Sequence, residues 1–238
     1  MEPLENSFDA PQNAPPELAP RWNGLSTRVV SALTLGLIAA FCLWRGGFAF
    51  MVFVMLAALV MKKEWDGLIA AASITARAFG YAYVILPCAM LLWLRAVPDT
   101  GLSATVALVL MISATDIGAY FVGKRFGRHK LAPTISPGKT WEGLGGGMAA
   151  CIVTALLLST SIPVAHGFIG RVLLGVCIAA LSQAGDLFES HMKRRAGVKD
   201  SGTLLPGHGG LLDRLDGYMF TTPVYAFLIH LALQAPPQ

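Results

Sequence analysis

Long apolar blocks recur along this chain and constrain its fold more than any other feature of the sequence. Seven of them are candidate membrane spans, at residues 26–44, 47–61, 79–95, 101–123, 142–160, 167–188 and 217–234. A helix of about 20 apolar residues crosses the hydrocarbon core of a bilayer, which is roughly 30 Å thick. The blocks therefore predict an all-α, polytopic integral membrane protein with about seven transmembrane helices. Because the block at 47–61 is short, six and eight spans remain alternatives.

The composition agrees with a chain that mostly faces lipid. Charged residues make up 13% of the 238 residues, whereas a soluble domain usually carries about 25%. A large soluble protein with an apolar core is excluded, since the apolar residues form continuous blocks rather than one-sided helical stripes. The four cysteines all lie in apolar blocks without a CxxC pair, so we interpret them as packing residues rather than metal ligands or disulfides.

Three parts of the chain differ in composition. Residues 1–21 are polar, acidic and rich in proline, and they lack the basic and apolar regions of a signal peptide. We expect them to form a disordered cytosolic tail. Residues 22–95 hold the N-terminal transmembrane helices. Residues 96–238 hold the remaining spans and most of the polar motifs, and we interpret them as the catalytic transmembrane domain.

The basic residues predict the orientation. With the N-terminus inside, all of the 18 lysines and arginines except Arg45, Arg95 and Arg171 lie on the cytosolic side. The positive-inside rule then predicts a multi-pass protein of the cell (inner) membrane with a cytosolic N-terminus. Residues 62–78 are expected to be interfacial. The polar loops at about 124–141 and 189–216 also lie in the cytosol, and the active site is expected there.

The first polar motif reads Ser136-Pro137-Gly138-Lys139-Thr140-Trp141-Glu142-Gly143. Its proline and glycines predict an irregular backbone with exposed amide groups, which leads into a helix near Trp141. Ser136, Lys139 and Thr140 supply donors for a phosphate at that helix N-terminus, and Glu142 lies beside them. The spacing is not that of a Walker loop. A basic membrane-flanking loop with a Ser/Thr helix cap is the alternative.

The second motif is an acid inside the fourth apolar block. Asp116 lies there with Tyr120 one helical turn later on the same face. A carboxylate at this depth costs roughly 2.5–3.5 kcal/mol or more unless it is paired or hydrated. We therefore expect both residues to bind substrate, with a structural hydrogen bond between helices as the alternative.

The third and strongest motif runs from residue 186 to residue 216. Acids stand at the end of the sixth span and the start of the seventh, and basic residues and glycines lie between them. Nucleotidyl transfer needs carboxylates for Mg²⁺ and cations for phosphate oxygens, and this pattern supplies both. The alternative is a set of snorkelling and orienting charges. The residues concerned are Asp186, Glu189, Ser190, Lys193, Arg194, Lys199, Asp200, His208, Gly209, Gly210, Asp213, Arg214 and Asp216.

This third motif resembles the signature of the phosphatidate cytidylyltransferases, also called CDP-diacylglycerol synthases. The matching residues are Ser190-x-Met192-Lys193-Arg194, Val198-Lys199-Asp200-x-Gly202, Leu205-Pro206, His208-Gly209-Gly210-Leu211 and Asp213-Arg214-Leu215-Asp216. The first two motifs are similar to the family as well. Gly138 and Gly217 depart from its pattern, because lysine and serine are common there, and the chain is shorter than typical members.

The resemblance implies an all-helical membrane fold with a cytosol-facing polar funnel. It implies that CTP and phosphatidate give CDP-diacylglycerol and pyrophosphate, with Mg²⁺ held by Asp186 and Asp213 and with K⁺ beside it. Membrane lipids and a second copy of the chain are the implied partners, and no nucleic acid is expected. A CTP-dependent lipid kinase and a transporter of anionic headgroups are the rival interpretations.

The residues also suggest individual roles within such a reaction. We expect Asp216 and Asp200 to support the two metal-binding acids. Lys193, Lys199 and Arg214, together with Lys139, would neutralise phosphate charge. His208 would assist proton movement or donate a hydrogen bond. The other polar residues named above are expected to line the substrate site.

Overall fold

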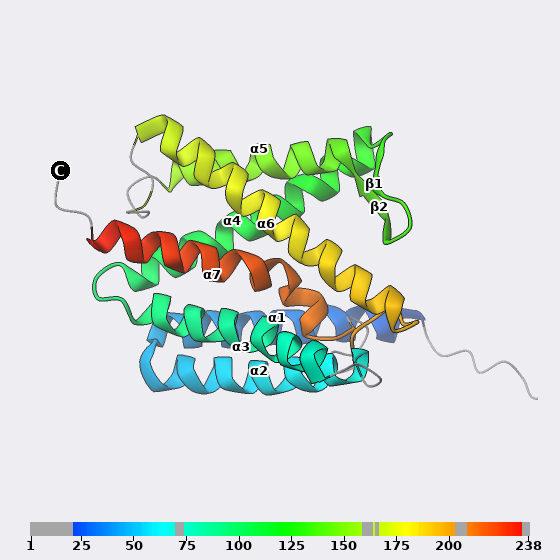
Figure 1. The fold of residues 1–238 in the computed structure, drawn as a ribbon, viewed down its shortest axis with the longest axis horizontal. Coiled ribbons are helices and arrows are strands. Elements are labelled where there is room, and N and C mark those ends of the chain that lie inside the picture. Colours follow the sequence, from blue (N-terminus) through cyan, green and yellow to red (C-terminus); the bar gives the residue numbers. More distant parts are fainter. Residues whose placement is uncertain (1–20, 70–73, 159–163, 165–166, 203–208, 235–238) are drawn as a thin grey trace, which may run out of the picture.

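Seven helices and one small hairpin make up the described part of the chain. The computed structural model describes residues 21–69, 74–158, 164, 167–202 and 209–234. Figure 1 shows the elements in chain order: α1 (Arg21–Arg45), α2 (Gly47–Leu68), α3 (Ile74–Ala96), α4 (Gly101–Phe126), β1 (Lys130–Ala132), β2 (Ser136–Thr140), α5 (Trp141–Leu157), α6 (Gly167–Arg195) and α7 (Leu212–Gln234). Helices α1 to α3 lie along one side of α7, and α4 to α6 lie along the other (Figure 1).

Each predicted span coincides with one helix, so the all-α membrane fold is confirmed. Within the described residues, three segments are long and apolar enough to cross a membrane, namely Arg77–Ala96, Gly101–Phe126 and Gly167–Arg195. Val29–Arg45 and Trp141–Leu157 are shorter apolar helices. The total of seven spans stays a prediction. The interfacial segment expected at 62–78 is helical at both ends, because α2 continues to Leu68 and α3 starts at Ile74.

The expectation of an irregular backbone in the first polar loop was wrong. Residues 136–140 form strand β2, which pairs antiparallel with β1. Lys130 lies opposite Thr140 and Ala132 opposite Ser136, with a shift in register between Lys130 and Ala132. A proline is tolerated in β2 because each strand of a two-stranded sheet is an edge strand, where one side needs no ladder donor. The following helix starts at Trp141, as the sequence predicts. The hairpin therefore holds the polar motif in a defined geometry.

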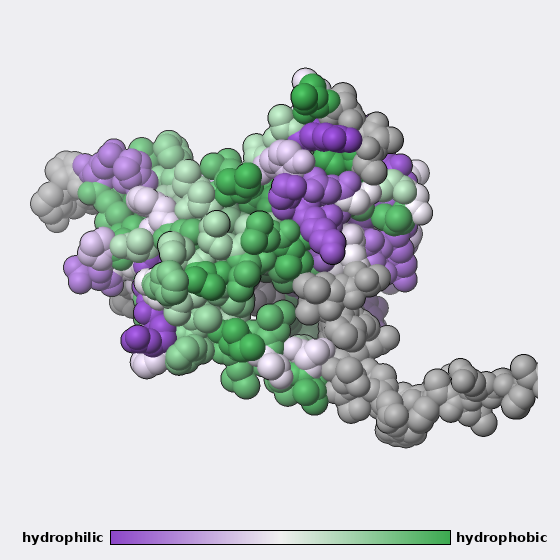
Figure 2. Space-filling model, turned by 90° about the horizontal axis from the view of Figure 1, so that it is seen from below, coloured by the Kyte–Doolittle hydropathy of each residue, from purple (hydrophilic) through white to green (hydrophobic). Residues whose placement is uncertain are grey.

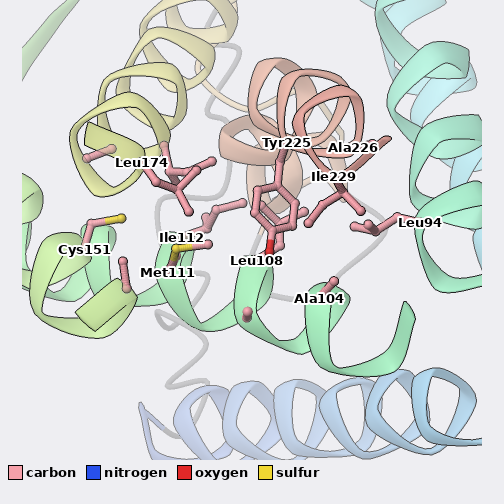
Figure 3. Close-up of a cluster of buried hydrophobic side chains, with 14 residues drawn as sticks. Leu94, Ala104, Leu108, Met111, Ile112, Cys151, Leu174, Tyr225, Ala226 and Ile229 are labelled. Carbon is pink, nitrogen blue, oxygen red and sulfur yellow. The ribbon is translucent and has the colours of Figure 1, made fainter. Parts of the chain in front are cut away.

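The main core lies where α3 to α7 meet. Leu108 and Met111 on α4, Cys151 on α5, Ile178 on α6 and Tyr225 on α7 are all fully buried in it, and Figure 3 shows most of this cluster. The cysteine serves as a packing residue, as expected from its apolar surroundings. Glycines let α4 and α5 approach closely, since a Cβ at Gly147 would meet the backbone of α4.

A second cluster joins the N-terminal helices to α6 and α7. The rings of Trp65 (α2) and Tyr83 (α3) lie 5.0 Å apart between centroids. Tyr83 lies the same 5.0 Å from Phe188 on α6. Phe188 in turn lies 5.5 Å from Phe220 on α7. This aromatic cluster fixes the C-terminal end of α2 against the polar ends of α6 and α7.

Helices α1 and α2 form a tight hairpin around Gly46. This residue has φ 63°, a left-handed conformation that favours glycine. Arg95 at the end of α3 closes the turn, because its Nε donates to Leu43 O at 2.7 Å and its Nη2 to Trp44 O at 3.0 Å. A Cβ at Gly46 would lie 2.6 Å from the Arg95 guanidinium.

The outer surface is strongly apolar over the middle of the molecule. Figure 2 shows hydrophobic residues across the centre of one face and hydrophilic residues at both of its ends. Large side chains such as Leu37 on α1, Phe48 on α2 and Phe121 on α4 are well exposed. A soluble domain rarely exposes a patch of this extent, so this surface is the part that faces lipid.

Candidate active site

Two clusters of charged side chains lie at the same end of the molecule. The hairpin β1–β2 and the C-terminal end of α6 both lie at this end in Figure 1. The first cluster joins β2 to α6, and the second joins α6 to α7. Three elements, β2, α6 and α7, thus bring residues of the first and third motifs to this end of the molecule.

Lys139 on β2 forms the centre of the first cluster. Its Nζ lies 2.5 Å from Asp186 Oδ2 on α6 and donates to Gln183 Oε1 at 2.8 Å. Ser190 extends the cluster, since its Oγ lies 3.4 Å from Asp186 Oδ1. The lysine is largely covered, with 15% of its side chain exposed. The Lys139 ammonium group is therefore already held in place by the Asp186 carboxylate, and a phosphate that bound here would contact this cation.

A cavity of about 460 Å³ opens beside this first cluster. It lies between α4, β2, α5 and α6, and the first two motifs meet there. Among the predicted residues, its lining includes Asp116, Tyr120, Lys139, Thr140 and Asp186. The cavity gives these residues a common space in which a polar substrate can lie.

Two other residues of the first motif stabilise its fold. Thr140 Oγ1 accepts a hydrogen bond from Gly143 N at 3.1 Å and so caps α5. Glu142 lies 2.6 Å from His129 Nδ1 and accepts from the Arg128 amide at 3.1 Å. These contacts tie the end of the hairpin to its start. The helix cap considered as an alternative from the sequence is present, together with a cavity-lining position for Thr140.

Asp213, in the first turn of α7, is the centre of the second cluster. Lys193 Nζ on α6 lies 2.6 Å from Asp213 Oδ1. The Ser201 and Gly210 amides donate to Oδ2 at 3.0 Å and 2.8 Å. Glu189 is fully buried, and its Oε1 lies 3.4 Å from Lys193 Nζ. One carboxylate thus organises both ends of the loop between α6 and α7.

This environment keeps the Asp213 carboxyl ionised. Burial favours the neutral acid and acts to raise the pKa. The interaction with Glu189 and hydrogen bonds from Lys193 and two backbone amides outweigh burial and lower the pKa of the Asp213 carboxyl from its ordinary value. The group is therefore a carboxylate near neutral pH and can accept further donors or a cation.

The two acids predicted to bind metal contact different lysines. Asp186 pairs with Lys139 and Asp213 pairs with Lys193. Asp216 lies three residues after Asp213 on α7, and its backbone touches α6, because a Cβ at Gly185 would overlap Asp216 O. Within the described ranges, no three His, Cys, Asp or Glu side chains are grouped to hold a metal ion by themselves. Mg²⁺ commonly takes one or two carboxylates and completes its shell with phosphates and water, so the donor set fits that ion only together with a substrate.

Comparison with known proteins identifies the family. The sequence model of the Cytidylyltransferase family matches residues 66–232, which include α3 to α6, the hairpin and most of α7. The chain belongs to the cytidylyltransferase family. It is therefore a nucleotidyltransferase by family, as the signature in the third motif predicts.

Named relatives of this cytidylyltransferase come from several bacteria. The chain is 36% identical over 242 residues to a phosphatidate cytidylyltransferase of Brucella suis, with 82% of this chain and 89% of the relative covered. It is 42% identical over 138 residues to a phosphatidate cytidylyltransferase of Bacillus subtilis, with 58% of this chain and 51% of the relative covered. A protein of the same name from Haemophilus influenzae is 40% identical over 140 residues, covering 57% of this chain and 49% of the relative.

The remaining predicted residues of the cytidylyltransferase surround the two clusters. Arg194 Nε lies 3.4 Å from Ile135 O and links the end of α6 to the hairpin, next to Ser136. Lys199 and Asp200 are exposed, and Arg214 is exposed in the first turn of α7. The roles of these residues stay predictions.

The glycines of the third motif lie against the second cluster. Gly209 has φ 86°, which favours glycine, and a Cβ there would approach both Asp213 and Asp200. Gly210 is buried and donates to Asp213, as described above. His208 lies outside the described residues, so its predicted role stays untested.

Sequence reasoning missed two residues of the site. Gln183, one helical turn before Asp186, binds Lys139 and lines the cavity. Glu64 on α2 contacts the loop before α7. An uncharged glutamine in an apolar block and an acid directly after two topology-setting lysines gave weak signals. For Glu64, the available signal was an acid at a predicted span end, the same signal that identified the third motif.

Proposed function

We propose that this cytidylyltransferase acts on CTP and phosphatidate and releases CDP-diacylglycerol and pyrophosphate. The single observation that carries the proposal is the presence of two largely covered lysine–carboxylate pairs at the polar end of membrane helices, of which the Lys139–Asp186 pair lines a cavity. The named relatives support the choice of lipid substrate. A phosphate-rich pair of substrates needs cations for its oxygens and carboxylates for a divalent ion.

The proposed reaction is a direct in-line displacement. A phosphate oxygen of phosphatidate bonds to the α-phosphorus of CTP, and the bond from that phosphorus to the oxygen bridging to the β-phosphate breaks. The electron pair of the broken bond leaves with pyrophosphate. Because a phosphate monoester is largely dianionic near neutral pH, its attacking oxygen needs no strong general base. The protein therefore contributes position and charge rather than covalent chemistry.

Each cluster has a separate task in this proposal. Lys139 and Lys193 bind phosphate oxygens, and their carboxylate partners keep both side chains oriented before substrate arrives. Asp116 and Tyr120 line the cavity on its α4 side and contact the substrate there. Positive charge at the exposed rim of the proposed site comes from Lys199, Arg214 and Arg194. Asp200 and Asp216 support the acids beside them.

Mg²⁺ is the proposed cofactor, and Asp186 and Asp213 are the residues that would hold it, with K⁺ nearby. When bound, it would neutralise the charge of the nucleotide phosphates. The two carboxylates retain acceptor capacity for this, because each ionised carboxylate has about four lone-pair sites. Lys139 and Lys193, which lie beside these carboxylates, would bind the phosphate oxygens of the substrates.

The proposed location is the inner membrane, with several spans and with the active site at the cytosolic face. The excess of basic residues at the polar loops supports this orientation. CTP then reaches the site from the cytosol, while phosphatidate reaches it from the lipid that covers the apolar surface in Figure 2.

Product identification tests the function. The purified protein is incubated with phosphatidate and CTP labelled at either the α- or the γ-phosphate. The proposal expects the α-label in the lipid and the γ-label in pyrophosphate. Transfer of the γ-label to a lipid alcohol such as diacylglycerol, supplied in a parallel reaction, with CDP as the other product, would assign a lipid kinase instead. Absence of any transfer, with movement of labelled lipid headgroups across a vesicle membrane, would assign a transporter.

A further inference from the structure

A buried acid on α2 contacts the loop that leads into α7. Glu64 is 8% exposed. Its Oε1 accepts a hydrogen bond from Leu211 N at 2.9 Å, and its Oε2 accepts one from Leu212 N at 2.8 Å. Ser201 Oγ lies 3.3 Å from the same Oε2. The residues on the two sides of these contacts are separated by well over a hundred positions in the sequence.

These contacts supply hydrogen-bond acceptors for backbone amides at the start of α7. Helix α7 begins at Leu212, and the first amide groups of a helix have no partner within it. A carboxylate at this end both accepts those hydrogen bonds and interacts favourably with the helix dipole. Glu64 thus caps α7 from a different helix, a role that a residue just before the helix usually fills.

The backbone of the loop wraps closely around the Glu64 carboxylate. A Cβ at Gly202 would lie 2.7 Å from Glu64 Oε1, and a Cβ at Gly210 would lie 2.7 Å from Oε2. The next residue on α2, Trp65, is 1% exposed and packs in the aromatic cluster. The packing of Trp65 sets the rotation of α2 and so directs Glu64 toward the loop.

Glu64 and Asp213 hold the same two pieces of backbone. Ser201 contacts Glu64 through its hydroxyl and Asp213 through its amide. Gly210 donates to Asp213 at 2.8 Å, and the next amide, of Leu211, donates to Glu64 at 2.9 Å. If the contacts to Glu64 were lost, the backbone near Ser201 and the backbone near Gly210 would be held by only one of the two carboxylates, that of Asp213. The orientation of Asp213 would then depend more strongly on its contact with Lys193.

We propose that Glu64 is a positioning residue of this enzyme, which fixes residues 201–202 and 209–212 so that Asp213 faces the substrate. The predicted effect of Glu64 on turnover rests on the proposed function. The predicted effect of Glu64 on the loop does not depend on that function. Glu64 lies just outside the segment matched by the family, which starts at residue 66.

The same helix offers a matched control. Asp66 also carries a carboxylate and lies two positions after Glu64, but its Oδ2 pairs with Lys62 Nζ at 2.7 Å on the exposed side of α2. Both side chains of that pair are about two fifths exposed, at 44% and 40%. Asp66→Ala removes an acid from α2 without removing an acceptor from the loop.

Hydrogen exchange tests the contact itself. Wild type, Glu64→Ala, Glu64→Gln and Asp66→Ala are compared in the same detergent, and exchange is followed in the peptide 209–216. We expect the peptide to exchange at least about tenfold faster in Glu64→Ala, because two charge-assisted hydrogen bonds are lost. Asp66→Ala should match the wild type. Equal exchange in Glu64→Ala and wild type would overturn the proposal.

Kinetics test the consequence for the reaction. We expect Glu64→Ala to lower kcat at least about tenfold, with a smaller change in KM for CTP, because a misplaced acid weakens the transition state more than the ground state. Glu64→Gln keeps one acceptor oxygen and should recover part of kcat. If Glu64→Ala fails to fold, the glutamine variant decides, since faster loop exchange and lower kcat are expected there too. Wild-type kcat in a folded variant with a loosened loop would also overturn the positioning role.

The two measurements keep the inference separate from the proposed function. If the wild-type protein transfers no cytidylyl group from CTP, the proposed function fails, whatever the exchange experiment shows. If the wild type is active and Glu64→Ala retains both its loop protection and its kcat, only the role of Glu64 fails.

Discussion

Lys193 Nζ on α6 lies 2.6 Å from Asp213 Oδ1 on α7. Both side chains are largely covered, with 14% and 10% exposed, so the pair is far less screened than a surface ion pair. The two helices are joined here by the very groups proposed to bind phosphate and metal. Changes to either residue should therefore affect turnover much more strongly than they affect membrane insertion.

Asp213→Asn tests this relationship directly. The amide keeps one acceptor oxygen but loses the charge that balances Lys193, so we expect kcat to fall on the order of 100-fold or more. The yield of membrane-inserted protein and its gel-filtration profile in detergent serve as controls. Near-normal turnover of the purified variant would exclude Asp213 as a ligand of the catalytic metal.

Lys139→Ala removes the cation that joins β2 to α6. We expect kcat/KM for CTP to fall about 10- to 100-fold, because a charge-assisted contact to phosphate is lost and Asp186 loses its partner. Lys130→Ala is the matched control, since Lys130 lies on the other strand of the hairpin and is exposed. An equal loss in both variants would indicate a general charge effect of the hairpin rather than a specific phosphate contact.

Removal of divalent cations should stop the reaction reversibly. We expect no transfer in excess EDTA and full recovery on addition of Mg²⁺, since Asp186 and Asp213 would hold an ion that neutralises the charge of the substrate phosphates. Asp186→Asn should raise the Mg²⁺ concentration needed for half-maximal rate, whereas Asp66→Asn should leave it unchanged. Activity that persists in EDTA would contradict the cofactor assignment.

Gly185→Ala tests the close approach of α6 and α7. An added Cβ would overlap Asp216 O, and overpacking of this kind costs about 1–3 kcal/mol. We expect a lower thermal midpoint in detergent and reduced turnover. Gly145→Ala on α5 is the control, because a Cβ there meets nothing within 4 Å. A stable, fully active Gly185→Ala protein would show that the two helices can separate at the site without consequence.

The sequence predicts the helices well because their cause is local. Each apolar block is long enough to determine a helix by itself, and every predicted span coincides with one of α1 to α7. The hairpin β1–β2 could not be predicted in this way, because its strands are three and five residues long and lack an alternating apolar pattern. The hairpin is held in place by contacts with α5 and α6, such as the ion pair between Lys139 and Asp186.

The sequence predicted most charged residues of the candidate site, but it did not predict which of them contact one another. The acids and lysines of the third motif stand out because charges are rare in this chain. Which lysine contacts which acid depends on how β2, α6 and α7 pack. Glu64 shows the limit most clearly, since its partners Leu211 and Leu212 contribute only backbone amides, which no side-chain pattern can reveal.

The contact between Glu64 and the start of α7 changes how the first three helices should be regarded. They are more than a membrane anchor, because one of their side chains completes the cap of α7. A protein shortened to begin at α4 would insert into a bilayer and still lack that cap. Chimeras between relatives should therefore exchange α2 and α7 as a unit, and a junction placed between them would need an acid restored at position 64.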